Sequence, residues 1–301
     1  MAGFDPQTTS AQRRRVVLVL VAAVLGISSS AVLVKLMDAT ALTIATWRMA
    51  GATVLVGLVA GRELQRLRLA HLGSVSVAGV ALALHFWAWF ASVQYTTVLR
   101  STLLVSLVPL WTALLEGLRG AGWPEARQQR GFGLAMGGLL VIEGLASGEV
   151  AGPRALLGDG LAVFAGMLWA VYLSVGRRIR QSLPVTVYFG AVCGVGAVVL
   201  ASIAGVSGEP LFAVDARTAG LIGLAILGPQ LLGHQGFAYA IRWMDATTIS
   251  LLMLLEPVGA TLLALIVLGE RPAMAAVIGG LLVVMGVAHA TAKRPAGVDN
   301  Q

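Results

Sequence analysis

The sequence predicts an all-α integral membrane protein: ten transmembrane helices in two inverted five-helix repeats, with both termini cytoplasmic. Three observations predict this fold class: an apolar composition, ten apolar stretches near spanning length and an internal repeat. The 301 residues are 57% hydrophobic and 12% charged, whereas a soluble protein carries about 25% charged residues. Glycine contributes 37 residues, an enrichment expected where membrane helices pack closely.

The ten stretches follow one another with short connections. A spanning helix needs about 17–25 predominantly apolar residues. The expected spans are residues 16–34, 41–60, 72–93, 100–119, 130–147, 156–176, 186–205, 218–241, 247–268 and 273–291.

The basic residues predict the orientation. With the N-terminus inside, fifteen lie in inner segments, five in outer segments, and Arg48 lies within a span. The inner set is Arg13, Arg14, Arg15, Arg62, Arg66, Arg68, Arg119, Arg127, Arg130, Arg177, Arg178, Arg180, Arg242, Lys293 and Arg294, and the outer set is Lys35, Arg100, Arg154, Arg217 and Arg271. This bias is typical of cytoplasmic loops, so the net charge of +7 indicates orientation and no nucleic-acid partner.

The internal repeat relates residues 97–138 to residues 245–286. A shift of 148 positions aligns a proline with a proline twice and a glycine with a glycine twice, and both residue types constrain the backbone conformation. The pairs are Pro109 with Pro257, Pro124 with Pro272, Gly131 with Gly279, and Gly138 with Gly286. Five helices per half is an odd number, so the second half must enter the membrane inverted, as in many transporters. We expect the halves to be residues 1–148 and 149–301.

Four polar side chains lie deep within predicted spans, where a charge costs about 2.5–3.5 kcal/mol. They are Arg48, His85, His234 and Glu256. Glu256 precedes Pro257, which leaves the carbonyl of Met253 without its helical partner; it is either a site for a substrate amine or proton, or a packing carboxylate paired with Arg48. Arg48 is either a structural arginine or a carboxylate-binding group. The histidines either line a pathway or pack with hydrogen bonds.

Aromatic and hydroxyl side chains complete the expected binding site. Trp89 in HFWAWF, Trp169, Tyr172 and Tyr239 are candidates for the walls of a pocket, with ordinary packing as the alternative. Ser28 and Ser106 are candidate hydrogen-bonding groups or interhelical contacts. We expect helix kinks at Pro109, Pro229 and Pro257.

Several chemistries are not indicated. The chain has no GxxxxGK[ST], GxSxG, CxxC or HExxH motif and a single cysteine, Cys193, so we expect no bound metal, no cofactor and no ATP hydrolysis. The spacing Gly133–Gly137 predicts close helix packing within the fold or in a dimer.

The two repeats, the second span with Arg48 and the Glu256-Pro257 pair resemble the drug/metabolite transporter superfamily, EamA type. The third span, HFWAWFASVQY, is most similar to bacterial amino-acid exporters of the YddG type. The resemblance implies a central cavity and export by alternating access. The second-half element LGERP, which is intact from Gly269 to Pro272, has a divergent counterpart in Gly122-Trp123-Pro124.

From these observations we expect a non-enzymatic secondary transporter in the bacterial inner membrane, exporting amino acids (aromatic, apolar and others) or similar metabolites. The expected partners are a small-molecule substrate and the lipid bilayer, with a monomer or a homodimer as the assembly. The alternatives are export of drugs, nucleotides or sugars, an ion-conducting channel, or an integral-membrane enzyme using His85, His234 and Glu256.

Overall fold

The computed structural model describes residues 4–5, 7–96, 98–120, 122–146, 154–268 and 274–292. Apart from a bridge between Phe4 and Met244, this part of the chain forms no β structure. Its helices are α1 (Ser10–Ser28), α2 (Ser30–Leu36), α3 (Ala41–Ala60), the 3-10 helix η1 (Gly61–Arg66), α4 (Leu69–Tyr95), α5 (Val98–Val105), α6 (Val108–Leu118), α7 (Ala126–Ala146), α8 (Ala155–Ile179), α9 (Val185–Ser207), α10 (Ala216–Ala225), the π-helix η2 (Ile226–His234), α11 (Gln235–Ala240), α12 (Ala246–Met253), α13 (Glu256–Leu268) and α14 (Met274–Thr291).

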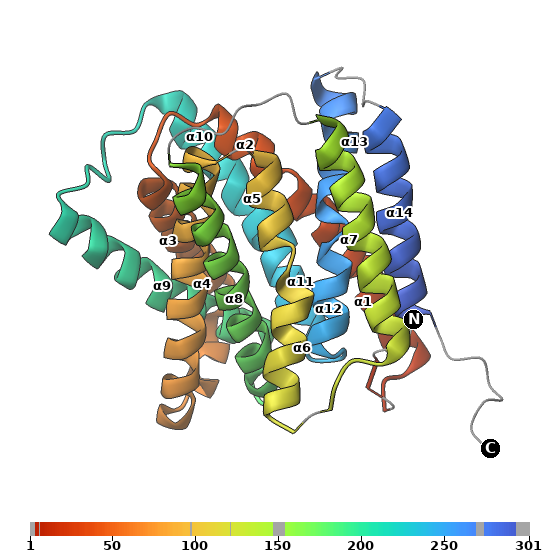
Figure 1. The fold of residues 1–301 in the computed structure, drawn as a ribbon. Helices are drawn as coiled ribbons and strands as arrows, with labels where there is room; N and C mark the ends of the chain where they lie inside the picture. Colours follow the sequence, from red (N-terminus) through yellow and green to blue (C-terminus); the bar gives the residue numbers. More distant parts are fainter. Residues whose placement is uncertain are drawn as a thin grey trace.

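The helices stand side by side as one bundle, with α7, α13 and α14 along one side and α9 on the opposite side (Figure 1). In the described residues, six helical segments are long and apolar enough to cross a membrane: Ser10–Val34, Ala41–Arg66, Leu69–Tyr95, Ala155–Ile179, Val185–Ser207 and Ala246–Leu263. Leu103–Leu118 and Val277–Thr291 are shorter apolar helices. The all-helical membrane class is therefore supported, while the number of ten spans stays a prediction. The predicted boundary at 148/149 and the segment Gly269–Pro272 lie outside the described residues.

Local signals explain where helices begin and end. The side-chain oxygen of Thr9 accepts a hydrogen bond from the backbone N–H of Gln12, and the Gln12 side chain accepts one from the N–H of Thr9; this pair forms a capping box. Asp215 and Asp245 cap α10 and α12 in the same general way. Gly208 ends α9 with φ +70°, a left-handed conformation that favours glycine.

Two helices are interrupted at positions related by the repeat offset. The first interruption separates α5 from α6 and the second separates α12 from α13, so that residues 106–107 correspond to residues 254–255 after a shift of 148. The helices α5 and α12 begin 148 residues apart, and so do α6 and α13. Pro109 and Pro257 each occupy the second position of the helix that follows the interruption, where the missing proline N–H leaves no helical bond unmade.

The repeat glycines form the contact between α7 and α14. A Cβ atom on Gly138 would lie 2.5 Å from the carbonyl oxygen of Gly279, and one on Gly131 would lie 2.5 Å from that of Gly286. The offset of 148 relates Gly138 to Gly286 and Gly131 to Gly279, so the two contacts are reciprocal under the repeat. Within the described residues nothing lies within 4 Å of a Cβ on Gly133 or Gly137, so the expected intrachain packing of that pair is not found.

One end of the bundle, which we call the basic end, carries most of the described arginines. The N-terminus of α1, the connections that follow α3, α6, α8 and α11, and the start of α7 meet there, at the lower end of Figure 1. These segments contain Arg13, Arg14, Arg15, Arg62, Arg66, Arg68, Arg119, Arg127, Arg130, Arg177, Arg178, Arg180 and Arg242. At the opposite end, the described chain has Lys35, Arg100, Arg154 and Arg217.

Candidate functional site

A cavity lies in the middle of the bundle, between segments of both halves of the chain. Including its opening, the cavity holds about 590 Å³ of empty space. Its walls come from the α1–α2 junction, α4, the α5–α6 interruption, α8, η2 and the α12–α13 interruption. The lining residues are Ile27, Ser30, His85, Trp89, Val105, Ser106, Val108, Trp169, His234, Ser250, Met253, Leu254, Glu256 and Pro257.

The interruption between α12 and α13 places Glu256 at the cavity. Glu256 is the first residue of α13, so its carboxylate lies at a helix N-terminus, where the helix dipole stabilises a negative charge. The Ser28 hydroxyl donates to the Val24 carbonyl at 2.7 Å and lies 3.2 Å from the Glu256 carbonyl oxygen. Ser28 thus anchors the backbone at the start of α13 to α1.

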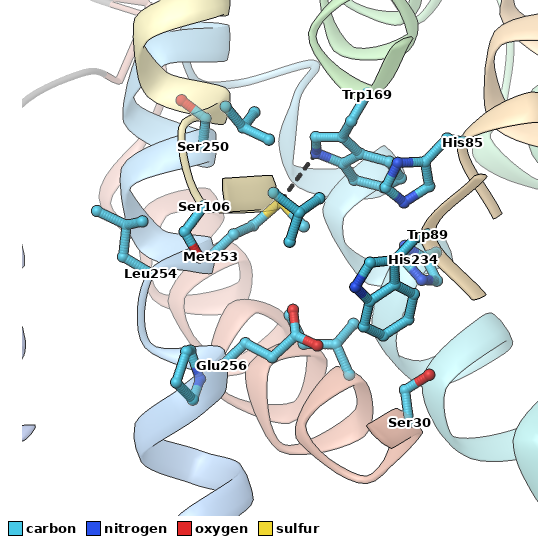
Figure 2. Close-up of a pocket in the computed structure, with 14 residues that line it drawn as sticks. Ser30, His85, Trp89, Ser106, Trp169, His234, Ser250, Met253, Leu254 and Glu256 are labelled. Carbon is cyan, nitrogen blue, oxygen red and sulfur yellow. Dashed lines mark hydrogen bonds between the residues drawn. The ribbon is translucent and has the colours of Figure 1, made fainter. Parts of the chain in front are cut away.

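The carboxylate of Glu256 projects into the cavity, facing Trp89 (Figure 2). No described residue forms a hydrogen bond or an ion pair within 4.0 Å with this carboxylate. Among the described lining residues it is the only acidic side chain, and none of these residues is a lysine or an arginine. The cavity therefore presents one carboxylate without a direct partner among the described residues, which favours a ligand with a positively charged group.

Aromatic rings form the wall opposite Glu256. The ring centroids of His85 and Trp169 are 4.9 Å apart, and those of His234 and Trp169 are 5.0 Å apart. His85 Nδ1 lies 2.8 Å from the Ala165 carbonyl oxygen; a carbonyl only accepts, so Nδ1 carries the proton. The Trp169 indole N–H donates to the Met253 sulfur at 3.0 Å, as shown in Figure 2.

Two nitrogen atoms of this wall are buried and have no hydrogen-bond partner among the described residues: Trp89 Nε1 and His234 Nδ1. Leaving a buried polar group unpaired costs about 1–3 kcal/mol. An acceptor on a ligand would recover that cost. The cavity thus combines a free carboxylate on one side, unpaired nitrogen atoms on the other, and aromatic surface between them.

Arg48 lies behind the cavity wall and does not line it. It is fully buried, and its guanidinium donates to Ser30 Oγ at 3.2 Å and to Gln230 Oε1 at 3.0 Å. The guanidinium also lies over the rings of Phe86 and Phe90, at 4.9 and 5.3 Å from their centroids, which is attractive for a cation. Arg48 therefore connects α2, α3, α4 and η2, and it reaches the cavity only through Ser30.

The structure brings together six of the ten binding residues expected from sequence: His85, Trp89, Ser106, Trp169, His234 and Glu256. Ser28 and Arg48 lie directly behind the wall. Tyr172 is buried beneath Trp169, with ring centroids 4.9 Å apart. Tyr239 lies toward the basic end, where the Arg15 guanidinium is 5.7 Å from the centroid of its ring.

The binding residues expected from the sequence did not include Ser30, Ser250, Met253 or Gln230. An amide beside Pro229 inside an apolar span was a usable signal for Gln230. Its side chain lies in η2, the π-helix that contains Pro229, and π-helical turns are frequent at functional sites. Nothing in the sequence separates Met253 from other apolar residues of its span.

In the described residues, no group of three or more His, Cys, Asp or Glu side chains is arranged to hold a metal ion. The fold defines a multi-pass membrane protein with a cavity between its helices. The sequence profile of the EamA-like transporter family matches residues 14–144 and again residues 156–291. The chain belongs to this family, and it is a membrane transporter.

Curated relatives carry the same general description. An uncharacterized transporter of Archaeoglobus fulgidus is 26% identical over 226 residues, which cover 74% of this chain and 76% of the relative. The uncharacterized transporter YyaM of Bacillus subtilis is 26% identical over 254 residues, covering 82% and 83%. A solved crystal structure superimposes with a TM-score of 0.74 and 23% identity, covering 93% of this chain and 98% of that one. This last similarity shows the fold alone.

Proposed function

We propose that the protein is a secondary transporter that exports amino acids, aromatic and apolar ones among them, across the bacterial inner membrane by alternating access. The observation that carries the proposal is the cavity between the two interruptions, with the free carboxylate of Glu256 opposite the unpaired nitrogen atoms of Trp89 and His234. An α-amino acid carries an ammonium group and a carboxylate group on the same carbon atom, and this cavity has complementary groups on opposite walls.

In the proposed complex, the substrate ammonium binds the Glu256 carboxylate. The substrate carboxylate accepts from the indole N–H of Trp89 and from an imidazole N–H of His234. The substrate side chain then packs against Trp169, His85 and the aliphatic lining residues, which suits an apolar or aromatic side chain. Hydrogen bonds that involve a charged group contribute about 1.5–3 kcal/mol each, so the polar contacts would fix the orientation of the substrate.

Two features support alternating access by two inverted halves with both termini in the cytoplasm. The interruptions of the fourth and ninth predicted spans obey the 148-residue offset, and the glycine contacts between α7 and α14 are reciprocal under the same offset. Related halves of this kind rock against each other around a site near the membrane midplane. The arginine-rich basic end would face the cytoplasm.

The charges of the lining residues also distinguish between the alternative substrates. A nucleotide would bring phosphate charges into a cavity whose walls contain Glu256 and no lysine or arginine, so the charges oppose it. A cationic drug shares the amine and the aromatic surface of the proposed substrate but lacks its carboxylate. Comparing these two substrates therefore tests the role of Trp89 and His234.

The test is counterflow in liposomes containing the purified full-length protein. Vesicles are preloaded with unlabelled phenylalanine, methionine or threonine, and entry of labelled tracer is followed with and without a pH gradient. We expect saturable counterflow that is lost in Glu256→Gln and retained in the control Glu63→Gln, because Glu63 bonds to Thr186 outside the cavity. Absence of counterflow for every amino acid, together with counterflow of a cationic drug, would refute the amino-acid proposal. Chemical conversion of the substrate would indicate an enzyme.

A further inference from the structure

Two hydrogen bonds connect α6 and α12 on the side of the cavity nearer the basic end. The hydroxyl oxygens of Thr112 and Ser250 are 3.0 Å apart, and the Thr247 hydroxyl donates to Glu116 Oε2 at 2.7 Å. Thr112 Oγ1 also lies 3.0 Å from the Pro109 carbonyl and Ser250 Oγ lies 2.8 Å from the Thr247 carbonyl, so one hydroxyl gives up its bond within its own helix when the two bond to each other. Thr112, Ser250 and Thr247 are all buried. Both bonds join the first half of the chain to the second, so they resist separation of the halves at this level.

These bonds lie between the cavity and the basic end. Ser250 itself lines the cavity, whereas Glu116 lies one helical turn further along α6 than Thr112, toward the end of that helix. The contact between Trp169 and Met253 closes the wall beside them. These contacts therefore close the space between α6 and α12 on the side of the cavity that faces the basic end.

The segments on the other side of the cavity pack differently. Here α5 packs against α8, α4 and α7, while α13 packs against α1, α14 and α2, so that these two segments have separate partners. In the described residues, no hydrogen bond between side chains joins α5 to α13. Within the described residues, α6 and α12 thus close the basic side, and no side-chain hydrogen bond closes α5 against α13 in the same way.

The repeat offset shows what a matching closure would contain. Shifting by 148 positions relates Thr112 to Ala260 and Glu116 to Ala264, and it relates Thr247 to Leu99 and Ser250 to Thr102. Only Thr102 retains a hydroxyl, and its counterpart across the interface is Ala260. Closure of the outer side by equivalent movements of α5 and α13 would therefore form neither hydrogen bond.

We propose that Thr112, Glu116, Thr247 and Ser250 form a polar lock on the cytoplasmic entrance of the substrate path, and that the lack of an outer equivalent makes the outward-facing state the resting state. This inference rests on the proposed alternating access and adds the residues that set its balance. Two related halves would give states of similar free energy if their closing contacts were equivalent. Here one closure has two interhelical hydrogen bonds that the other lacks.

The experiment measures access to the cavity from each side of the membrane. Cys193 is the single cysteine of the chain, so a Cys193→Ser background removes the native thiol. Val108, which lines the cavity at the start of α6, is replaced by cysteine as a reporter. A small, charged, membrane-impermeant thiol reagent is then added to the cytoplasmic or the outer side of oriented vesicles.

The lock is opened with Thr112→Val and Thr247→Val, which remove one hydroxyl from each bond and keep the side-chain shape. Interhelical hydrogen bonds in membranes average about 0.6 kcal/mol, or about threefold in an equilibrium constant. We therefore expect cytoplasmic labelling to increase roughly threefold for each variant and roughly eightfold for both together. Thr261→Val is the matched control, because that hydroxyl bonds within α13, to Pro257 at 2.9 Å.

The converse variant supplies the missing outer pair. Ala264→Glu with Leu99→Thr should decrease labelling from the outer side and increase it from the cytoplasmic side. The lock is overturned if the double valine variant is labelled from the cytoplasm no faster than Thr261→Val while outer labelling shows an intact cavity. Labelling needs no substrate. An absence of amino-acid counterflow would thus refute the proposed function alone, and unchanged labelling would refute the lock alone.

Discussion

Replacing Gly138 by alanine should separate two helices that now touch through their backbones. The new Cβ atom would lie 2.5 Å from the carbonyl oxygen of Gly279 and 2.8 Å from the nitrogen of Val283. An ordinary contact at this position begins near 3.4 Å, so α7 and α14 would have to move apart by roughly 0.9 Å. Because the obstructing atoms belong to the backbone, no side-chain rotation relieves the clash.

The expected cost follows from two opposing terms. Overpacking a tight interface costs about 1–3 kcal/mol, whereas alanine is favoured over glycine inside a helix by up to about 1 kcal/mol. Gly137→Ala provides the control on the same helix, because nothing in the described chain lies within 4 Å of its added Cβ. The free energy of unfolding of Gly138→Ala should therefore be lower than that of Gly137→Ala by about 1–3 kcal/mol.

The assay is reversible unfolding of the purified protein in mixed micelles, followed by helical circular dichroism as the denaturing detergent fraction is raised. Gly279→Ala should act like Gly138→Ala. Their double variant should cost less than the sum of the single variants, because both act on one contact. Equal stability of Gly138→Ala and Gly137→Ala would refute the conclusion that this glycine contact holds α7 against α14.

Three further changes test the site. Gln230→Leu removes an acceptor from a buried guanidinium and should lower the free energy of unfolding by about 1–3 kcal/mol; an unchanged value in the same micelle assay would exclude this role. Trp89→Phe keeps an aromatic ring, although a smaller one, and removes the unpaired N–H, so half-saturation in counterflow should require roughly tenfold more amino acid, whereas Trp87→Phe, outside the cavity lining, should behave as wild type. Pro109→Ala and Pro257→Ala should reduce the transport rate more than the amount of protein in the membrane, and normal transport by both would show that the interruptions do not depend on proline.

Several parts of the site were predictable because their signals are local. A charge, an imidazole or an indole inside an apolar span is conspicuous at any position, since burial there is costly. Glu256, His85 and Trp89 were identified in this way, and all three line the cavity. The repeat prolines were likewise visible, and both interrupted helices resume next to them.

Other parts depend on which faces of the helices meet. Tyr172 is one helical turn from Trp169, yet it packs under that ring and does not reach the cavity. The four-residue spacing of Gly133 and Gly137 is typical of closely packed helices. In the structure, however, Gly138 faces α14, and these two glycines do not. Periodicity places residues on a common face of one helix, and it does not say which face a distant helix will cover.

The sequence by itself determined the membrane class, the family and the internal repeat, because composition, hydropathy and Pro/Gly spacing are properties of consecutive residues. The tertiary structure alone decided that Arg48 lies behind the wall with Gln230 and Ser30, and that the Glu256 carboxylate stands free in the cavity. It also decided that hydroxyls of Thr112 and Ser250, 138 positions apart, meet across the two halves. Such pairings depend on how each helix is rotated and how deep it lies in the bundle. The free energy of the whole bundle determines both, so they cannot be read from the sequence of a single span.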